Sequence, residues 1–172
     1  TDTTICESEV AAGYRLDDAT SSSTNASYAW QALGGDGSFD DDSDLNATYF
    51  PGTTDTSNGS VVLQLSATST TGICTSTVIE ELTLNITRSA SVDAGLSAIA
   101  LCENESIQIS GASAQFYDPN SISWSSSGTT GTLTSNNTLT PTYTPSASDV
   151  AAGSVTLTLS VLPLSPCDAS GP

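Results

Sequence analysis

Four stretches of the chain alternate apolar and polar residues, as a β-strand does when only one of its faces is buried. They are SVVLQLSA (60–67), ELTLNIT (81–87), SIQISGA (106–112) and SVTLTLSV (154–161). Threonine favours strands, so the Thr-rich faces of these stretches do not weaken the prediction. No stretch sustains the 3.6-residue period of a helix, and none is long and apolar enough to span a membrane. The pattern predicts an all-β protein.

The last of these stretches belongs to a segment that occurs twice. YTPSASDVAAGSVTLTLS (143–160) repeats the skeleton of YFPGTTDTSNGSVVLQLS (49–66), which lies 94 residues earlier. TICESE (4–9) also matches ALCENE (100–105), Trp30 matches Trp124, and Cys74 matches Cys167, with offsets of 96, 94 and 93 residues. Loop insertions and deletions produce such a drift in duplicated domains. Repetition at this length predicts two tandem domains, residues 1–90 and 91–172, rather than the shorter units of a solenoid.

Each repeat contains short strands separated by turn-rich loops, which is typical of an immunoglobulin-like β-sandwich. Trp30 and Trp124 lie where a central strand places a core Trp between two sheets, and the alternative is a Trp that stacks on a sugar. The expected strands are 11–17, 27–32, 36–40, 46–51, 60–68 and 78–88 in the first repeat, and 105–112, 121–126, 130–134, 140–145 and 154–162 in the second.

The second repeat lacks the closing strand of the first. TSTVIEELTLNIT follows Cys74, whereas only DASGP follows Cys167. Either the chain is a fragment cut before that strand, or a strand from another molecule completes the sheet, as in donor-strand filaments. We therefore expect the second domain to be a truncated sandwich.

The four cysteines occupy equivalent places in the two repeats, and no close C-x-x-C pair for a metal or redox site occurs. Their equivalence favours one disulfide within each repeat, Cys6–Cys74 and Cys102–Cys167. Each bond would close a loop of more than 60 residues, which is worth roughly 4 kcal/mol in the chain-entropy model. Disulfides form in oxidising compartments, so we expect an extracellular location.

The charge balance excludes several classes of function. Two basic residues, Arg15 and Arg88, stand against 19 acidic ones, giving a formal charge of −17. Nucleic-acid binding needs Lys and Arg to displace phosphate counterions, and an anionic membrane surface would repel this chain. The chain has no His, so His-activated Ser or Cys nucleophiles are ruled out. We expect no enzyme, no nucleic-acid partner and no direct insertion into a membrane.

An acidic loop, GDGSFDDDSD (35–44), is the candidate for binding a cation. Asp36, Asp40, Asp42 and Asp44 offer the hard oxygen ligands that calcium prefers, and Asp41 lies among them. The second repeat has TGTLTSNNT at this place, so a site here would not be common to both repeats. The alternative is a solvated acidic loop. Calcium is therefore an optional ligand, and no cofactor is required.

Asp55 and Asp149 recur in both repeats, between a Pro and the following Gly-Ser-Val strand. An Asp at such a place accepts hydrogen bonds from backbone N–H groups at the start of a short helical turn. In SASDVAAGS (146–154) the turn is expected to begin at Asp149 and to end at Gly153. We expect a structural role for both carboxylates.

The second repeat resembles a known family. The segments VDAG, LCENESIQISGA, ISWSSSGTTGTLTSNNTLTPTYTPSASDVAAGSVTLTLSV and PC are similar to the PKD-like/Ig-like tandem repeats of giant Bacteroidetes cell-surface adhesins, of the SprB gliding-motility type. The first repeat is a diverged copy. The resemblance covers almost the whole chain, and it assigns no catalytic residues.

This resemblance implies stalk repeats of a long filament attached to the outer membrane, exported by type IX secretion and serving adhesion or gliding. The expected partners are neighbouring repeats of the same long chain, environmental or cell-surface polysaccharide, and, through other parts of the protein, the outer-membrane secretion and motility machinery. It also implies O-glycosylation at an Asp-Thr motif, with Thr3 of DTT (2–4) as the candidate. The alternatives are a polysaccharide- or calcium-dependent binding module, and a filament subunit completed by a donor strand.

Overall fold

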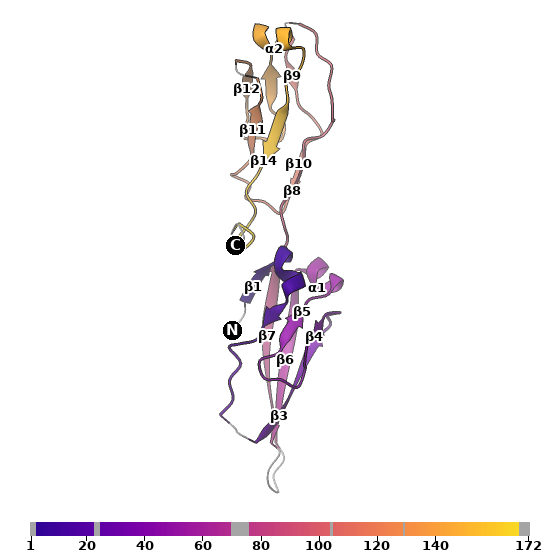
Figure 1. The fold of residues 1–172 in the computed structure, drawn as a ribbon, viewed down its shortest axis with the longest axis vertical. Coiled ribbons are helices and arrows are strands. Elements are labelled where there is room, and N and C mark those ends of the chain that lie inside the picture. The colour runs from indigo at the N-terminus through magenta and orange to yellow at the C-terminus, as the bar shows by residue number, and fades with distance from the viewer. Residues whose placement is uncertain (1–2, 23–24, 70–75, 104, 129, 169–172) are drawn as a thin grey trace. The chain divides into compact units, whose positions relative to one another are not determined.

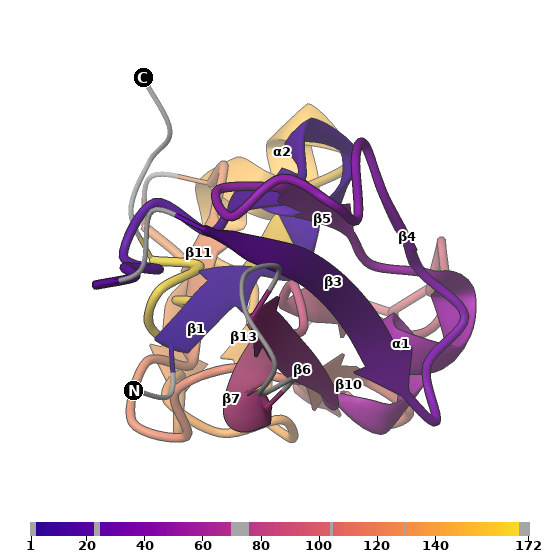
Figure 2. The same cartoon turned by 90° about the horizontal axis from the view of Figure 1, so that it is seen from below.

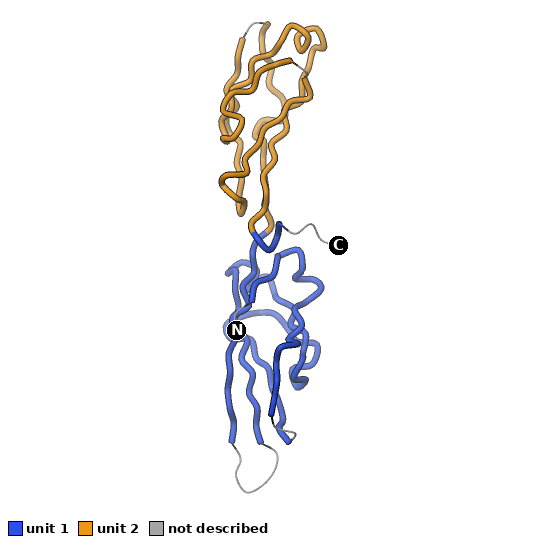
Figure 3. The backbone as a smooth tube through the Cα atoms, turned by 90° about the vertical axis from the view of Figure 1, so that its left-hand side faces the viewer, with its two compact units in different colours: residues 1–88, 165–172 blue, residues 89–164 orange. Residues whose placement is uncertain are grey.

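The computed structural model describes residues 3–22, 25–69, 76–103, 105–128 and 130–168 (Figure 1). Most regular structure in this part of the chain is β-strand, with two short α-helices and one 3-10 helix, so the predicted all-β class is confirmed. The chain divides into two compact units (Figure 3): unit 1 is Thr1–Arg88 with Ser165–Pro172, and unit 2 is Ser89–Leu164. The sequence placed residues 165–172 in the second repeat, whereas the structure groups them with unit 1.

Unit 1 contains two sheets. The larger has the order β1-β7-β6-β3, with β1 parallel to β7 and the other neighbours antiparallel. The smaller has the antiparallel order β2-β5-β4. In Figure 2, which views the molecule from below, β6 and β7 lie apart from β4 and β5. The strands are β1 Thr3–Cys6, β2 Tyr14–Arg15, β3 Ala26–Leu33, β4 Ser38–Phe39, β5 Thr48–Phe50, β6 Ser60–Ser69 and β7 Thr77–Thr87.

The core of unit 1 takes buried side chains from both sheets, which gives the unit a sandwich-like architecture. The alternation read from the sequence explains which residues point inward: in β6, Val61 and Leu63 are buried and Leu65 packs against them. Burying one such side chain contributes about 1.5–3 kcal/mol. The buried cluster is Ile5, Leu16, Trp30, Ala47, Tyr49, Val61, Leu63, Leu84 and Ile86.

Unit 2 has shorter strands and a smaller core. Its pairs are β11 with β14, β8 with β10, and the three-stranded order β12-β13-β9. Ile109, Trp124 and Leu159 form the buried cluster. The strands are β8 Ser91–Asp93, β9 Ile107–Gln108, β10 Ser113–Gln115, β11 Ser123–Ser126, β12 Thr132–Thr134, β13 Thr142–Thr144 and β14 Leu157–Ser160.

The strand β14 corresponds in sequence to β6, but its pairing differs. In unit 1, β6 lies between β3 and β7. In unit 2, β14 pairs with β11, and no described strand is hydrogen-bonded along its other edge, although β8 approaches β14. That unpaired edge is where a counterpart of β7 would pair.

The strand expected at 11–17 is mostly absent. A 3-10 helix, η1 Glu7–Ala12, occupies its first part, and β2 spans only Tyr14–Arg15. The Glu9 side chain accepts a 2.9 Å hydrogen bond from the backbone N–H of Cys6, and Gly13 donates 3.2 Å to the carbonyl of Val10. These local bonds cap a helical turn where apolar spacing alone favoured a strand.

Candidate functional site

A buried hydrogen bond joins a Tyr to an Asp in unit 1. The Tyr49 hydroxyl, on β5, donates to Oδ2 of Asp55 at 2.7 Å. Asp55 is 1% exposed and lies in the first turn of helix α1, Thr53–Asn58. The same carboxylate oxygen accepts from the Gly52 N–H at 2.9 Å, and Oδ1 accepts from the Asp36 N–H at 3.3 Å. These bonds fasten the helix start to the smaller sheet.

Unit 2 repeats this bond between equivalent residues. The Tyr143 hydroxyl donates to Oδ2 of Asp149 at 2.9 Å, and Asp149 is 8% exposed in helix α2, Ala147–Ala152. Ser146 donates to the same oxygen from its N–H and its hydroxyl, both at 2.8 Å. We call the two pairs, Tyr49–Asp55 and Tyr143–Asp149, the Tyr–Asp contacts.

The predicted structural role of Asp55 and Asp149 is confirmed, with one correction. Neither residue begins its helix: each is the third helical residue and bonds back to the N-cap residue, Gly52 or Ser146. The expected start of the second turn at Asp149 was therefore wrong, because the helix already begins at Ala147. The sequence reasoning missed the Tyr partner, although its signal was present: a Tyr lies six residues before the Asp in both repeats.

A glycine faces each Tyr hydroxyl. A Cβ at Gly37 would collide with the Tyr49 hydroxyl, and a Cβ at Gly131 would collide with the Tyr143 hydroxyl. The two glycines are 94 residues apart, as are the tyrosines. Close approach of backbone to the Tyr–Asp contact therefore requires glycine at both positions.

At the Tyr–Asp contacts the pKa of Asp149 is shifted downward and the pKa of both tyrosines upward. Hydrogen bonds from the Ser146 backbone and side chain, followed by Tyr143, hold the pKa of Asp149 below its ordinary value. Burial raises the pKa of Tyr49 and of Tyr143, and the hydrogen bond to the neighbouring carboxylate raises it further. The raised pKa keeps each phenol protonated as the hydrogen-bond donor to its Asp, which suits a bond that holds the fold together.

Asp36 caps helix α1 from another loop. Its carboxylate accepts from the Thr54 N–H at 2.9 Å and from the Thr53 hydroxyl at 3.1 Å. The N-cap residue, Gly52, has no side chain for this role, and a Cβ there would collide with Asp36. The backbone hydrogen bond from Thr54 is the main cause that lowers the pKa of Asp36.

In unit 2, different side chains cap the start of the equivalent helix, α2. Ser146 caps α2 itself, since its hydroxyl accepts from the Asp149 N–H at 3.2 Å. Thr130, which is 94 residues after Asp36, bonds to the hydroxyls of Ser146 and Ser148 at 2.6 and 2.7 Å. Position 36 or 130 therefore serves the helix start in both units.

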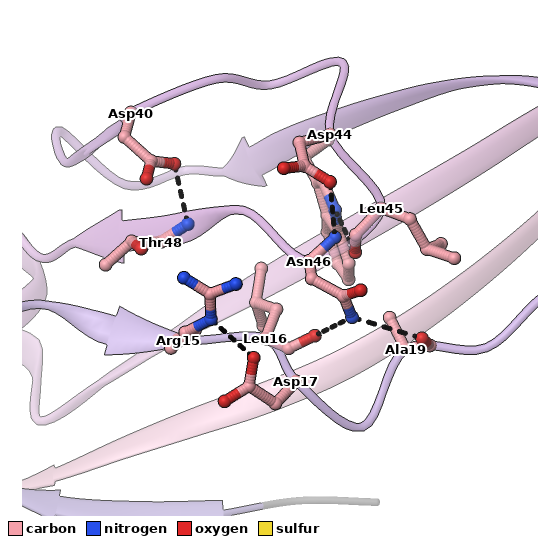
Figure 4. Close-up of polar contacts among 10 residues, drawn as sticks. Arg15, Leu16, Asp17, Ala19, Asp40, Asp44, Leu45, Asn46 and Thr48 are labelled. Atoms are coloured by element: carbon pink, nitrogen blue, oxygen red, sulfur yellow. Dashed lines mark hydrogen bonds and ion pairs between the residues drawn. The ribbon is translucent and has the colours of Figure 1, made fainter.

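Two other acidic side chains of the 35–44 loop, Asp40 and Asp44, accept hydrogen bonds from nearby backbone N–H groups (Figure 4). Asp40 accepts from the Thr48 N–H at 2.7 Å, and Asp44 accepts from the Asn46 N–H at 3.0 Å. The backbone carbonyl of Asp42 accepts a 2.8 Å hydrogen bond from the Trp30 N–H. Among the described residues, no three His, Cys, Asp or Glu side chains lie close enough together to hold a metal. Calcium binding by Asp36, Asp40, Asp42 and Asp44 stays a prediction.

Both Trp side chains belong to the cores, as predicted. Trp30 is buried and its indole N–H donates to the Leu45 carbonyl at 3.3 Å. Trp124 is buried in unit 2 and donates to the Thr138 carbonyl at 3.0 Å. These bonds tie the loop before β5 or β13 to the neighbouring strand, so neither ring offers an exposed face for stacking on a sugar.

The cysteine pairing predicted from the repeats is wrong. The structure joins Cys6 to Cys167, with Cα atoms 4.9 Å apart and a sequence separation of 161, and leaves Cys102 exposed without a disulfide. Since Cys6 and Cys167 bond to each other, neither Cys6–Cys74 nor Cys102–Cys167 forms; Cys74 itself lies outside the described residues. The reason is that residues 165–168 fold with unit 1, beside the ends of β1 and β7.

Thr3, the residue proposed for glycosylation, is the first residue of β1. It pairs with Leu84 in the parallel β1–β7 register, and its carbonyl accepts from the Asn85 side chain at 3.2 Å. Its side chain is half-buried. These bonds use the backbone of Thr3 and do not test its modification.

Unit 1 contains a cavity of about 230 Å³ beside the core, lined in part by Tyr14, Trp30, Glu80 and Glu81. No helix among the described residues is long and apolar enough to cross a membrane. No family model matches the chain, and no curated protein matches it.

Proposed function

We propose that the chain is a pair of PKD-like/Ig-like spacer repeats from the stalk of a large extracellular bacterial adhesin. The observation that carries the proposal is the recurrence of one structural frame in both units: a core Trp, a Tyr–Asp contact and a short capped helix at equivalent positions. The recurring residues maintain the fold, and the chemistry they share is structural. A module that is copied for its fold rather than for a site suits a stalk.

The covalent connectivity suits a stalk that bears load. The Cys6–Cys167 disulfide closes a loop that includes the whole of unit 2. With the bond intact, tension applied at the two ends of the chain passes through the disulfide and does not extend the chain between the cysteines, whose sequence separation is 161. At about 3.4 Å per extended residue, reduction would release roughly 550 Å of chain.

Single-molecule force spectroscopy tests this role directly. Handles attached at the two ends of the oxidised chain should give almost no extension at forces that unfold β-sandwiches. Adding a reductant should release roughly 550 Å in unfolding steps. A chain that extends fully while oxidised would contradict the load-bearing role. The adhesin setting, with type IX export, an outer-membrane filament and neighbouring repeats as partners, rests on the sequence resemblance.

A ligand-binding module is the first alternative, and the cavity beside Tyr14 and Trp30 is the observation that favours it. A polysaccharide array and a calcium titration on the intact chain separate the two functions. A spacer shows no saturable binding and no calcium-dependent change in melting temperature. Saturable binding that is lost in Y14A, with the fold retained, would favour the binding module.

A filament subunit completed by a donor strand is the second alternative, favoured by the edge of β14 that no described strand pairs with. A peptide with the sequence of β7, Thr77–Thr87, is the natural probe because β7 covers the equivalent edge of β6. Native mass spectrometry should detect a one-to-one complex if the edge accepts strands. The same residues in scrambled order serve as the control.

A further inference from the structure

The disulfide joins a cysteine of the first sequence repeat to a cysteine of the second. Cys6 is the first cysteine of repeat 1, and Cys167 is the second cysteine of repeat 2. By the repeat alignment, Cys102 is the counterpart of Cys6 and Cys74 is the counterpart of Cys167. The bond therefore runs from the first cysteine of repeat 1 to the second cysteine of repeat 2. The first cysteine of repeat 2, Cys102, is left without the equivalent partner, which would be the second cysteine of a following repeat.

Cys102 has the local setting of Cys6. Ile5-Cys6-Glu7 corresponds to Leu101-Cys102-Glu103. Cys6 is the N-cap of the 3-10 helix η1, and the carbonyl of Cys102 accepts a 3.2 Å hydrogen bond from the N–H of Glu105, three residues ahead. Cys6 therefore opens a 3-10 helix and Cys102 opens a hydrogen-bonded turn, and in both places a Glu lies three residues after the Cys.

The two cysteines differ in what covers them. Cys6 is 5% exposed, beneath the segment that carries Cys167, whereas Cys102 is exposed. The end of β7 holds that segment: Thr87 pairs with Cys6, its hydroxyl donates to the Ser165 carbonyl at 3.5 Å, and its own carbonyl lies 3.2 Å from the sulfur of Cys167. In unit 2 no described strand is hydrogen-bonded along the edge of β14 where a β7 counterpart belongs.

We propose that Cys102 forms a disulfide with the second cysteine of a further copy of this repeat, so that consecutive repeats are joined in series by the same bond as Cys6–Cys167. The proposal deepens the spacer function and rests on it, because a stalk supplies the further repeat. Two thiols lose two protons and two electrons as the sulfur–sulfur bond forms. A small-molecule disulfide, such as glutathione disulfide, accepts both and leaves as two thiols.

The consequence for an array is a set of overlapping covalent loops. Each loop would begin at the first cysteine of one repeat and end at the second cysteine of the next, as the loop from Cys6 to Cys167 does. The loop that begins at Cys102 would therefore start inside the loop that ends at Cys167. No stretch of backbone between consecutive bonds would then carry tension alone, which bonds confined to single repeats would not achieve.

The test uses a chain extended in register. Because Cys74 and Cys167 are equivalent, joining a second copy of residues 75–172 after Cys167 adds a β7 counterpart for unit 2 and one further repeat. The chain is refolded in a glutathione redox buffer, and its disulfides are mapped by mass spectrometry without reduction. We expect Cys6–Cys167, a bond from Cys102 to the added copy of Cys167, and a free added copy of Cys102.

The matched variant is C102S in the extended chain. It should keep Cys6–Cys167 and leave the added copy of Cys167 open to alkylation. Cys102 that remains a thiol, or that bonds to Cys74, while hydrogen exchange shows the added repeat folded, would overturn the proposal. Such a result would leave the spacer function standing, since that function is tested separately by ligand binding and by force.

The unextended chain in the same buffer distinguishes the source of the partner cysteine. A covalent dimer joined from Cys102 of one copy to Cys74 of another would place the partner in a second molecule. A monomer here, together with the expected bond in the extended chain, would place it in the next repeat of the same chain. Peptide mapping identifies the bonded cysteines in either case.

Discussion

Replacing Tyr49 by Phe removes one hydroxyl from the fully buried Tyr–Asp contact of unit 1 and leaves the ring in place. Asp55 Oδ2 then keeps one donor, the Gly52 N–H at 2.9 Å. A hydrogen bond to a charged group contributes about 1.5–3 kcal/mol, and a buried carboxylate that loses a donor sits at the upper part of that range. For a unit of this size, such a loss corresponds to a fall in melting temperature of roughly 10 °C.

The equivalent change in unit 2 is the internal comparison. Asp149 Oδ2 accepts two bonds from Ser146 in addition to the one from Tyr143. Since the carboxylate keeps two donors in Y143F, we expect a smaller loss of stability than in Y49F. Y117F serves as the control, because Tyr117 is half-buried and makes no side-chain hydrogen bond among the described residues.

Urea denaturation followed by pulsed hydrogen exchange and mass spectrometry reports each unit through its own peptides. Y49F should lower the unfolding midpoint of unit 1 peptides and leave those of unit 2 unchanged, with Y143F doing the reverse. Equal effects of Y49F and Y117F would refute the reasoning, because the hydroxyl would then contribute no more than any half-buried phenol. A larger effect of Y143F than of Y49F would refute the donor count.

Three further predictions concern the cap, the disulfide and pH. D36A removes the carboxylate that accepts from the Thr54 N–H and the Thr53 hydroxyl at the start of α1, so it should lower the melting temperature of unit 1, whereas T130A should have a smaller effect on unit 2 because Ser146 caps α2 itself. C6S and C167S should each destabilise the chain, by up to about 5 kcal/mol in the chain-entropy model, and the double variant should be no worse than either single one. The folded pKa of Asp149 is lowered, so its contribution is complete above the unfolded value of about 4 and is lost as pH falls below it; acid titration of unit 2 peptides should show this loss, and D149N should flatten it.

The sequence alone predicts the strands that alternate over a long stretch, because a half-buried face imposes its period on local residues. The strands expected at 60–68 and 78–88 match β6 and β7 closely. It does not predict β1, whose four residues acquire their strand conformation from parallel pairing with β7, where each partner, as in Thr3↔Leu84, lies 81 positions further along the chain. A short strand that depends on a distant partner leaves no periodic signal.

In the candidate site, too, the sequence predicts the local features and misses the contacts between distant residues. Recurrence identified Asp55 and Asp149 as structural and placed each in a capped turn, but the Tyr hydroxyl that completes each contact comes from a strand whose approach depends on tertiary packing. The loop carboxylate of Asp36 seemed free to bind a cation when considered beside its acidic neighbours. Its partners, the Thr53 hydroxyl and the Thr54 backbone N–H, are 17 and 18 residues away, so only the fold reveals them.

The cysteines show why equivalence between repeats does not by itself identify bonding partners. Duplication preserves the set of contacts, yet a contact between corresponding residues can connect a repeat to itself or to its neighbour, and the sequence looks the same in both cases. At the helix starts the two units keep the same geometry with different residues. Asp36 caps the helix that follows Gly52, whereas Ser146 and Thr130 cap the equivalent helix of unit 2. In both units the capped helix carries the Asp of a Tyr–Asp contact. Selection in such a chain acts on the bonds that fasten each unit, so the residues that vary between copies should be those whose bonds another side chain can make.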